Sequence, residues 1–156
     1  MGKFIVPRTF KIGVPDAILN KQGQLTLEEY PEIKKHPVVG GEILKDFTVL
    51  NDVAKGAYYH HERYDGTGYP EGLKGEEIPI EARIIGVADA IDAMNSNRVY
   101  RKRKDKSYIM QQLKEGKGTQ FDANIVDIFL KCLENYDIMQ IEIENTYSKM
   151  VELVEV

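Results

Sequence analysis

Apolar residues recur at helical spacing along most of the chain, and the alternating patterns typical of strands are scarce. The clearest segment is 80–95, where apolar residues at i, i+4, i+7, i+8 and i+11 form one face of a helix. That face consists of Ile80, Ile84, Val87, Ala88 and Ile91. The pattern predicts an all-α fold in which residues 80–95 form the central helix, with this face toward the core.

Start and stop signals place the other helices. Thr26 and Glu29 have the spacing of a capping box, which predicts a helix from there to about His36. Pro37 has no backbone N–H, so we expect a kink there and a helical continuation over 38–44. Further helices are predicted over residues 49–61, from about 105 or 107 to 116, and across 121–136.

Two segments interrupt or follow this helical pattern. Residues 65–75 hold four glycines and a proline, a density that requires a succession of turns. Residues 137–156 are ambiguous, because they contain two competing spacings. Met139, Ile141 and Ile143 alternate as in a strand, whereas Ile143, Tyr147, Met150 and Val154 have the spacing of a helix. We expect this tail to be helical.

Composition narrows the class of protein. A chain of 156 residues, 42% of them hydrophobic, suffices for one domain with its own core. The formal net charge of −4 argues against a surface that binds nucleic acid or anionic membranes generally. No apolar run approaches the roughly 20 residues that span a bilayer, and Cys132 is the single cysteine. We therefore expect a cytoplasmic domain without a disulfide that binds neither nucleic acid nor membrane.

The candidate chemistry lies around the three histidines of the chain, His36, His60 and His61, each next to a predicted helix break. Adjacent residues of a helix point about 100° apart, so His60 and His61 fit one ion poorly and suit two neighbouring ions, or one ion and a substrate. Asp89 adds an oxygen ligand, and Asp92 lies on the same helical face. A mixed set of His and Asp ligands suits iron, manganese or zinc, and paired ions of this kind activate water and stabilise phosphoryl oxygens.

A basic run follows the central helix. Six of the nine residues from Arg98 to Lys106 are Arg or Lys. Arg98 and Arg101 lie nearest to the helix that carries the aspartates, and guanidinium groups suit bidentate phosphate contacts. For residues 102–106 we favour a solvated turn between helices. A nucleic-acid interface over this run ranks last, because the run is short and the net charge is negative.

Four linked segments, in order along the chain, resemble the HD-GYP family. The main one is HHERYDGTGYPEGLKG at residues 60–75. The others are KIGVPDAILNK at 11–21, the His36-Pro37 pair followed by Gly40, and the stretch from Ile78 to Arg101. The resemblance covers roughly residues 11–136.

The resemblance implies an HD-type helical bundle with metal-dependent phosphodiesterase activity on cyclic di-GMP. It implies that His36, His60, His61 and Asp89 are ligands of divalent ions, most commonly iron or manganese. Lys11 corresponds to the lysine of the family's His-Asp motif that helps to position phosphate. The substrate contacts implied are Tyr69, Pro70, Asp92, Arg98 and Arg101.

The chain departs from the family pattern before Lys11. The family's paired His and Asp are expected four and three residues earlier, where this chain has Pro7 and Arg8. We therefore expect residues 1–136 to form a partial HD-GYP domain, truncated at its N-terminus or degenerate and lacking its first helices, and residues 137–156 to form the tail. The apolar face of the central helix, including Ile84, Val87 and Ile91, would then be exposed and would favour a homo-oligomer or a protein partner.

Two functional hypotheses remain open. The intact His60, His61 and Asp89 favour a metal-dependent hydrolase acting on cyclic di-GMP. Pro7 and Arg8 favour a non-catalytic module that binds a cyclic dinucleotide or docks onto a partner.

Overall fold

The structure, a computed structural model, describes residues 13–19, 21, 25–46, 51–95 and 104–135 of the chain. Within these ranges it is helical, and the extended pairing is limited to an isolated bridge between Lys117 and Phe121. The elements are α1 (Asp16–Leu19), α2 (Tyr30–Lys34), α3 (His36–Leu44), α4 (Asn51–Tyr59), the short 3₁₀ helix η2 (Gly75–Glu77), α5 (Ile80–Asn95), α6 (Lys106–Gly116) and α7 (Ala123–Asn135). The predicted all-α class is confirmed.

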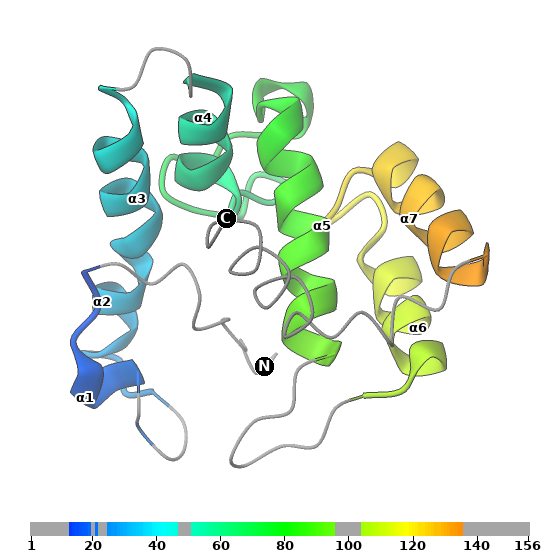
Figure 1. Cartoon of the computed structure of the whole chain (residues 1–156), viewed down its shortest axis with the longest axis horizontal. Coiled ribbons are helices and arrows are strands. Elements are labelled where there is room, and N and C mark those ends of the chain that lie inside the picture. The colour runs from blue at the N-terminus through cyan, green and yellow to red at the C-terminus, as the bar shows by residue number, and fades with distance from the viewer. Residues whose placement is uncertain (1–12, 20, 22–24, 47–50, 96–103, 136–156) are drawn as a thin grey trace, which may run out of the picture.

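The helices form a row with α5 near its centre (Figure 1). Helices α3 and α4 pack against each other, α4 packs on one side of α5, and α6 and α7 pack on the other side. None of the helices in the described ranges combines the length and the apolar character that a bilayer span requires.

The break between α2 and α3 follows from the His36-Pro37 sequence. Thr26 and Glu29 exchange the two hydrogen bonds of the predicted capping box, at 2.8 and 3.2 Å, and α2 begins at Tyr30. Pro37 lies in the first turn of α3, where a missing N–H costs nothing. The break therefore falls before His36 rather than after it, and His36 is the first residue of α3.

The central helix has the predicted bounds, but only two of the five residues of its predicted face are buried. Val87 and Ile91 are 0% and 8% exposed and join the core cluster with residues of α6 and α7. Ile80 and Ile84 are 45% and 43% exposed, and Ala88 is exposed too. The expectation that the whole face packs inward was wrong, because the core formed with α6 and α7 takes in Val87 and Ile91 and leaves the other three residues exposed. The expectation that Val87 and Ile91 would be exposed was wrong for the same reason.

The other predicted helices are shorter than expected or begin where their caps place them. Helix α6 begins after Asp105, whose side chain accepts a hydrogen bond from the Tyr108 N–H at 2.8 Å. Helix α4 ends at Tyr59, two residues before the predicted end. Gly86 lets α5 approach the end of α4 closely, because a Cβ there would lie 2.9 Å from the carbonyl oxygen of His60.

Several residues named in the sequence analysis lie outside the described ranges. These are Pro7, Arg8, Lys11, Arg98, Arg101 and the tail, residues 137–156. The expected roles of these residues, and the expected division at residue 136, stay predictions.

Candidate metal centre

The three histidines come together from two helix ends. His36 opens α3, and His60 and His61 follow the last residue of α4. One ring nitrogen from each lies within 4.8 Å of the others. The ring centroids of His60 and His61 are 4.1 Å apart. The expectation that neighbouring helical histidines would diverge was wrong, because α4 ends at Tyr59 and the pair lies in the following turn.

Backbone carbonyls orient two of the three rings. His36 Nδ1 donates to the Ile33 carbonyl at 2.6 Å, and His60 Nδ1 donates to the Ala57 carbonyl at 2.7 Å. Both carbonyls belong to helix ends, where backbone acceptors lack helical donors. In metal sites a bond of this kind fixes the ring orientation and leaves Nε2 as the ligand atom.

The distances fit a metal-binding role for these residues. The Nε2 atoms of His36 and His61 face each other at 3.1 Å. Two nitrogens about 2.0–2.1 Å from one ion, at angles of 90–109°, would lie roughly 2.9–3.4 Å apart. Two lone pairs at this distance need a proton or a cation between them. The histidine set therefore fits a divalent cation.

Burial keeps His60 in the protonation state that binds metals. Its side chain is 8% exposed, and this desolvation lowers the pKa of the imidazole below the usual 6.5, against the opposing effect of the carbonyls of Ala57 and Gly56. A neutral imidazole binds metal, whereas imidazolium has no lone pair to offer. His60 is therefore a competent ligand at neutral pH.

The two aspartates of α5 differ in position. Asp89 is half-buried and lines the same pocket as His60 and His61. Its charge also contributes to raising the pKa of Tyr69, so the two residues are close. Asp92 is half-buried as well but does not line the pocket. The structure thus brings Asp89, and not Asp92, to the pocket beside the histidines.

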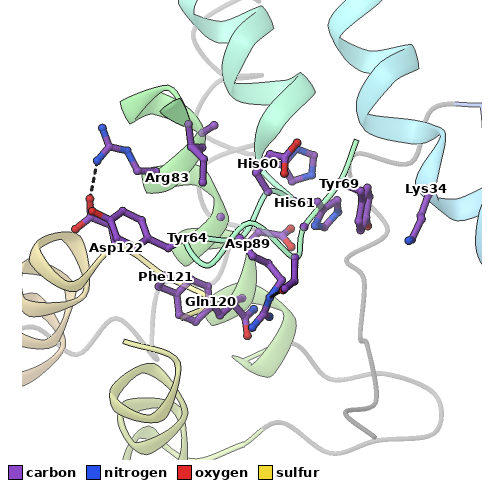
Figure 2. A pocket seen from close by; sticks show the side chains of 18 of the residues that line it. Lys34, His60, His61, Tyr64, Tyr69, Arg83, Asp89, Gln120, Phe121 and Asp122 are labelled. Carbon is purple, nitrogen blue, oxygen red and sulfur yellow. Dashed lines mark hydrogen bonds and ion pairs between the residues drawn. The ribbon is translucent and has the colours of Figure 1, made fainter. Parts of the chain in front are cut away.

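Tyr69 covers one side of the histidine cluster (Figure 2). Its ring centroid is 4.9 Å from that of His61. Burial raises the pKa of its hydroxyl above the usual 10, with smaller contributions from Tyr30 and Asp89. The hydroxyl therefore stays protonated and can donate a hydrogen bond. The next residue, Pro70, follows a cis peptide bond and does not line the pocket.

Asp65 organises the glycine-rich loop. Its carboxylate accepts hydrogen bonds from the Thr67 N–H at 3.0 Å and the Thr67 hydroxyl at 2.6 Å, and pairs with Arg63 at 3.2 Å. Desolvation raises the pKa of this carboxyl, but the hydrogen bonds of Thr67 and the charge of Arg63 outweigh it and lower the pKa to about 2. Asp65 is therefore ionised throughout the neutral range.

The connection between α6 and α7 also holds the glycine-rich loop, through backbone hydrogen bonds. The Asp65 N–H donates to the Thr119 carbonyl at 2.8 Å, and the Tyr64 N–H donates to the Gln120 carbonyl at 3.3 Å. The Gly75 N–H closes the loop by donating to the Tyr64 carbonyl at 3.0 Å. The backbone of the loop is thus held by a connection more than fifty residues further along the chain.

Sequence reasoning gave no role to Glu62, which is 8% exposed. One of its oxygens accepts hydrogen bonds from the N–H groups of Glu71 and Gly72, at 2.7 and 3.0 Å. The other, Oε2, is buried with no hydrogen-bond partner in the described part of the chain. The signal that could have found it is a carboxylate directly after the histidine pair, where a glycine-rich loop offers unsatisfied N–H groups.

The pocket beside the histidines has a volume of about 130 Å³. Its far end is closed by a buried ion pair between Arg83 of α5 and Asp122, 2.6 Å apart (Figure 2). Lys34 of α2 lies at the opposite end, next to Tyr69 (Figure 2). Neither Lys34 nor Asp122 was singled out by sequence reasoning, because Tyr69 and Arg83, which bring them to the pocket, lie far away in the sequence.

Comparison with known proteins gives several relatives of similar identity. A cyclic di-GMP phosphodiesterase of Thermotoga maritima is 43% identical over 123 residues, which make up 78% of this chain and 33% of that protein. The cyclic di-GMP phosphodiesterase response regulator RpfG of Xanthomonas campestris is also 43% identical, over 78% of this chain and 32% of its own length. A 3′3′-cGAMP-specific phosphodiesterase of Vibrio cholerae is 39% identical over 81% of this chain and 24% of its own length. The matches to the first two span about a third of those curated relatives.

The fold and the family agree with these relatives. The crystal structure of a cyclic GMP-AMP-specific phosphodiesterase of V. cholerae superposes with a TM-score of 0.57 at 19% identity, over 83% of this chain and 34% of that one. This likeness shows the fold. A family model described as an HD domain matches residues 8–125. With that match and relatives at 38–43% identity, the chain belongs to the HD domain family, in its HD-GYP group.

Proposed function

We propose that this chain is a metal-dependent phosphodiesterase domain that hydrolyses cyclic di-GMP or a related cyclic dinucleotide. The observation that carries the proposal is the cluster of His36, His60 and His61, whose ligand atoms lie within 4.8 Å of one another. The names of the relatives, which act on cyclic di-GMP or on 3′3′-cGAMP, support this substrate class.

In this proposal, His36, His60, His61 and Asp89 hold the ions, which are iron or manganese. Divalent ions at such a site supply an activated water and electrostatic stabilisation of the phosphoryl oxygens. The chain's own residues prepare the site. The Ile33 and Ala57 carbonyls orient two of the rings, and the protonated Tyr69 hydroxyl can donate to a phosphate oxygen.

The remaining roles are extensions of the same proposal. Lys11, Arg98 and Arg101 would stabilise the negative charge that develops on the phosphate. Pro70 would shape the loop beside the substrate. Asp92 would act only through a neighbouring residue, since it does not line the pocket.

One observation favours a second candidate function. Pro7 and Arg8 stand where the family pattern has its His-Asp pair. A proline side chain has no ligand atom, and an arginine brings a positive charge to a position where the family has a carboxylate. A module that retains metal at the three histidines and binds a cyclic dinucleotide without cleaving it is the alternative.

A paired assay separates the two functions. Metal content is measured on the purified chain, and hydrolysis of cyclic di-GMP is followed with added manganese or iron. The phosphodiesterase proposal expects turnover that His61→Ala abolishes and Asp52→Asn, an exposed change on α4, leaves intact. Binding of cyclic di-GMP without turnover would overturn hydrolysis and establish the binding module.

Self-association is a further part of the proposal. Ile80 and Ile84 leave an apolar strip exposed on the first half of α5, and apolar strips of this kind favour association. Light scattering over a concentration series tests it, and a constant monomer mass would contradict it.

A further inference from the structure

Lys34 lies at the rim of the pocket with its ammonium group between two aromatic rings. Its Nζ is 4.9 Å from the ring centroid of Tyr30 and 5.1 Å from that of Tyr69. A cation within about 6 Å of an aromatic ring is attracted by the negative face of that ring. The two tyrosines therefore hold the ammonium group in one place, half-buried at the pocket.

The ammonium of Lys34 has no carboxylate within ion-pair distance among the described residues. Its neighbour Lys35 points elsewhere and pairs with Glu32 at 2.7 Å. Lys21, Lys45, Lys55 and Lys117 are likewise paired with carboxylates. A positioned, half-buried cation without an anionic partner is the arrangement expected of an anion-binding group.

The position of Tyr69 indicates which anion Lys34 meets. The Tyr69 ring lies between His61 and Lys34 (Figure 2). A phosphate held at the histidine cluster is thus separated from Lys34 by an aromatic ring. Lys34 is placed for a second negative charge on the same ligand, on the other side of Tyr69.

The size of the pocket also indicates that the second negative charge of the ligand lies outside it. A volume of about 130 Å³ is below the roughly 300–1,000 Å³ of pockets that enclose a complete small ligand. The enclosed space therefore suits one phosphate with part of its nucleoside. A cyclic dinucleotide has two phosphodiester groups on opposite sides of its ring, so the second must lie outside this space.

We propose that Lys34 binds the second phosphate of the cyclic dinucleotide, the one that is not being cleaved, and so selects a substrate with two phosphodiesters over one with a single phosphodiester. This inference rests on the proposed function for its ligand class. Lys34 is a binding residue in this proposal and takes no part in the chemical step. Tyr30 and Tyr69 position its charge.

The test compares two ligands that differ in the number of phosphates. Cyclic di-GMP has two, and bis(p-nitrophenyl) phosphate has one. Lys34→Met keeps most of the length of the side chain and removes its charge, and Lys34→Arg keeps the charge. Lys35→Met is the matched control, because it removes an adjacent, exposed lysine with its own partner.

For Lys34→Met we expect a KM for cyclic di-GMP about 10-fold higher, the size of one lost charge-assisted contact, with kcat little changed. Hydrolysis of bis(p-nitrophenyl) phosphate should stay within about twofold of the unmodified chain, and Lys34→Arg should retain most of the affinity. An unchanged KM for cyclic di-GMP, or an equal loss with both substrates, would overturn the proposal.

Ligand binding tests the proposed role of Lys34 independently of turnover. A phosphorothioate analogue of cyclic di-GMP, which resists hydrolysis, and GMP are titrated into the same variants. Weaker binding of the analogue alone in Lys34→Met supports the role of Lys34 even if the unmodified chain proves not to hydrolyse cyclic di-GMP. Equal affinity of the unmodified chain and Lys34→Met for the analogue, or no binding by the unmodified chain, overturns it.

Discussion

His36 donates a hydrogen bond through its Nδ1 atom to the carbonyl oxygen of Ile33, 2.6 Å away. In an uninterrupted helix that carbonyl would accept the N–H of the residue four positions later, and that residue is Pro37, which has none. The proline therefore both ends α2 and leaves an acceptor for the imidazole. The Ile33 carbonyl thus holds Nδ1 of His36 and leaves Nε2 as the ligand atom.

Replacing Pro37 by alanine tests this relationship. The alanine supplies an N–H that competes for the Ile33 carbonyl and allows α2 and α3 to merge, so the His36 ring loses its fixed orientation. We expect manganese affinity to fall about 10-fold, as for other groups that orient metal ligands, in calorimetric titration of the folded variant. Pro31→Ala is the matched control, since Pro31 occupies the same first-turn position in α2 without an adjacent histidine. Equal affinity of the two variants would contradict the role of Pro37.

Gly68 lies where the glycine-rich loop comes very close to the backbone of Glu62 and Arg63. A Cβ at this position would lie 2.3 Å from the backbone nitrogen of Arg63 and 2.5 Å from Glu62 Cα. Because both contacts are to backbone, Gly68→Ala must displace the loop, and we expect a loss of about 3 kcal/mol in the free energy of unfolding by urea. Gly40→Ala is the control, because its Cβ would meet only Ala57 at 4.0 Å. That change should stabilise α3 by about 0.5–1 kcal/mol. A loss at Gly68 no larger than about 1 kcal/mol, the typical cost of a point substitution, would show that the loop yields easily.

The burial of His60 predicts a pH dependence of stability. Burial lowers the pKa of His60 in the folded chain below 6.5, so the unfolded chain binds the proton more readily. The stabilisation is complete above pH 6.5 and is lost as the pH falls through the lower, folded-state pKa. Urea unfolding of the metal-free protein between about pH 8 and pH 5 should show this decline, at most about 1.4 kcal/mol per pH unit for one proton. His60→Gln should flatten the curve. Identical slopes in both proteins would rule out His60 as the source.

The ion pair at the far end of the pocket should contribute more than those at the surface. The side chains of Arg83 and Asp122 are 15% and 6% exposed, so Arg83→Met leaves a buried carboxylate without its cation. We expect a loss of about 3 kcal/mol in the free energy of unfolding. Lys117→Met removes an exposed partner of Asp127, with side chains 37% and 50% exposed, and should cost about 1 kcal/mol or less. Similar losses in the two variants would show that burial does not set the strength of the Arg83 pair.

The helices could be predicted from the sequence where local signals decide them. The bounds of α5, the capping box of Thr26 and Glu29 and the start of α6 after Asp105 all depend on residues close together in the chain. The buried face of α5 could not be predicted in the same way. Ile84 and Val87 share one face, and only the packing of α6 and α7 decides that the first is exposed and the second is buried.

The candidate site, like the helices, could be predicted only where local sequence signals decide it. The resemblance named His36, His60, His61 and Asp89, and the structure brings the three histidines together with Asp89 in the adjoining pocket. Helical periodicity misled at His60 and His61, because the last turn of α4 ends earlier than its apolar pattern. The Arg83–Asp122 pair was missed because its two members lie 39 residues apart, and no local pattern encodes such a distance. Lys34 was missed because Tyr30 is its only aromatic partner nearby in the sequence among the described residues, and Tyr69, which brings it to the site, lies 35 residues away.

The bonds from Thr119 and Gln120 to the glycine-rich loop have a consequence for the length of the α6–α7 connection. The connection meets Asp65 and Tyr64 through the backbone carbonyl groups of Thr119 and Gln120, so its number of residues is constrained by two hydrogen bonds to the edge of the metal site. One added residue would shift the two carbonyls relative to their donors. The length of this short turn between two helices therefore affects a site whose three histidines lie in the first half of the chain.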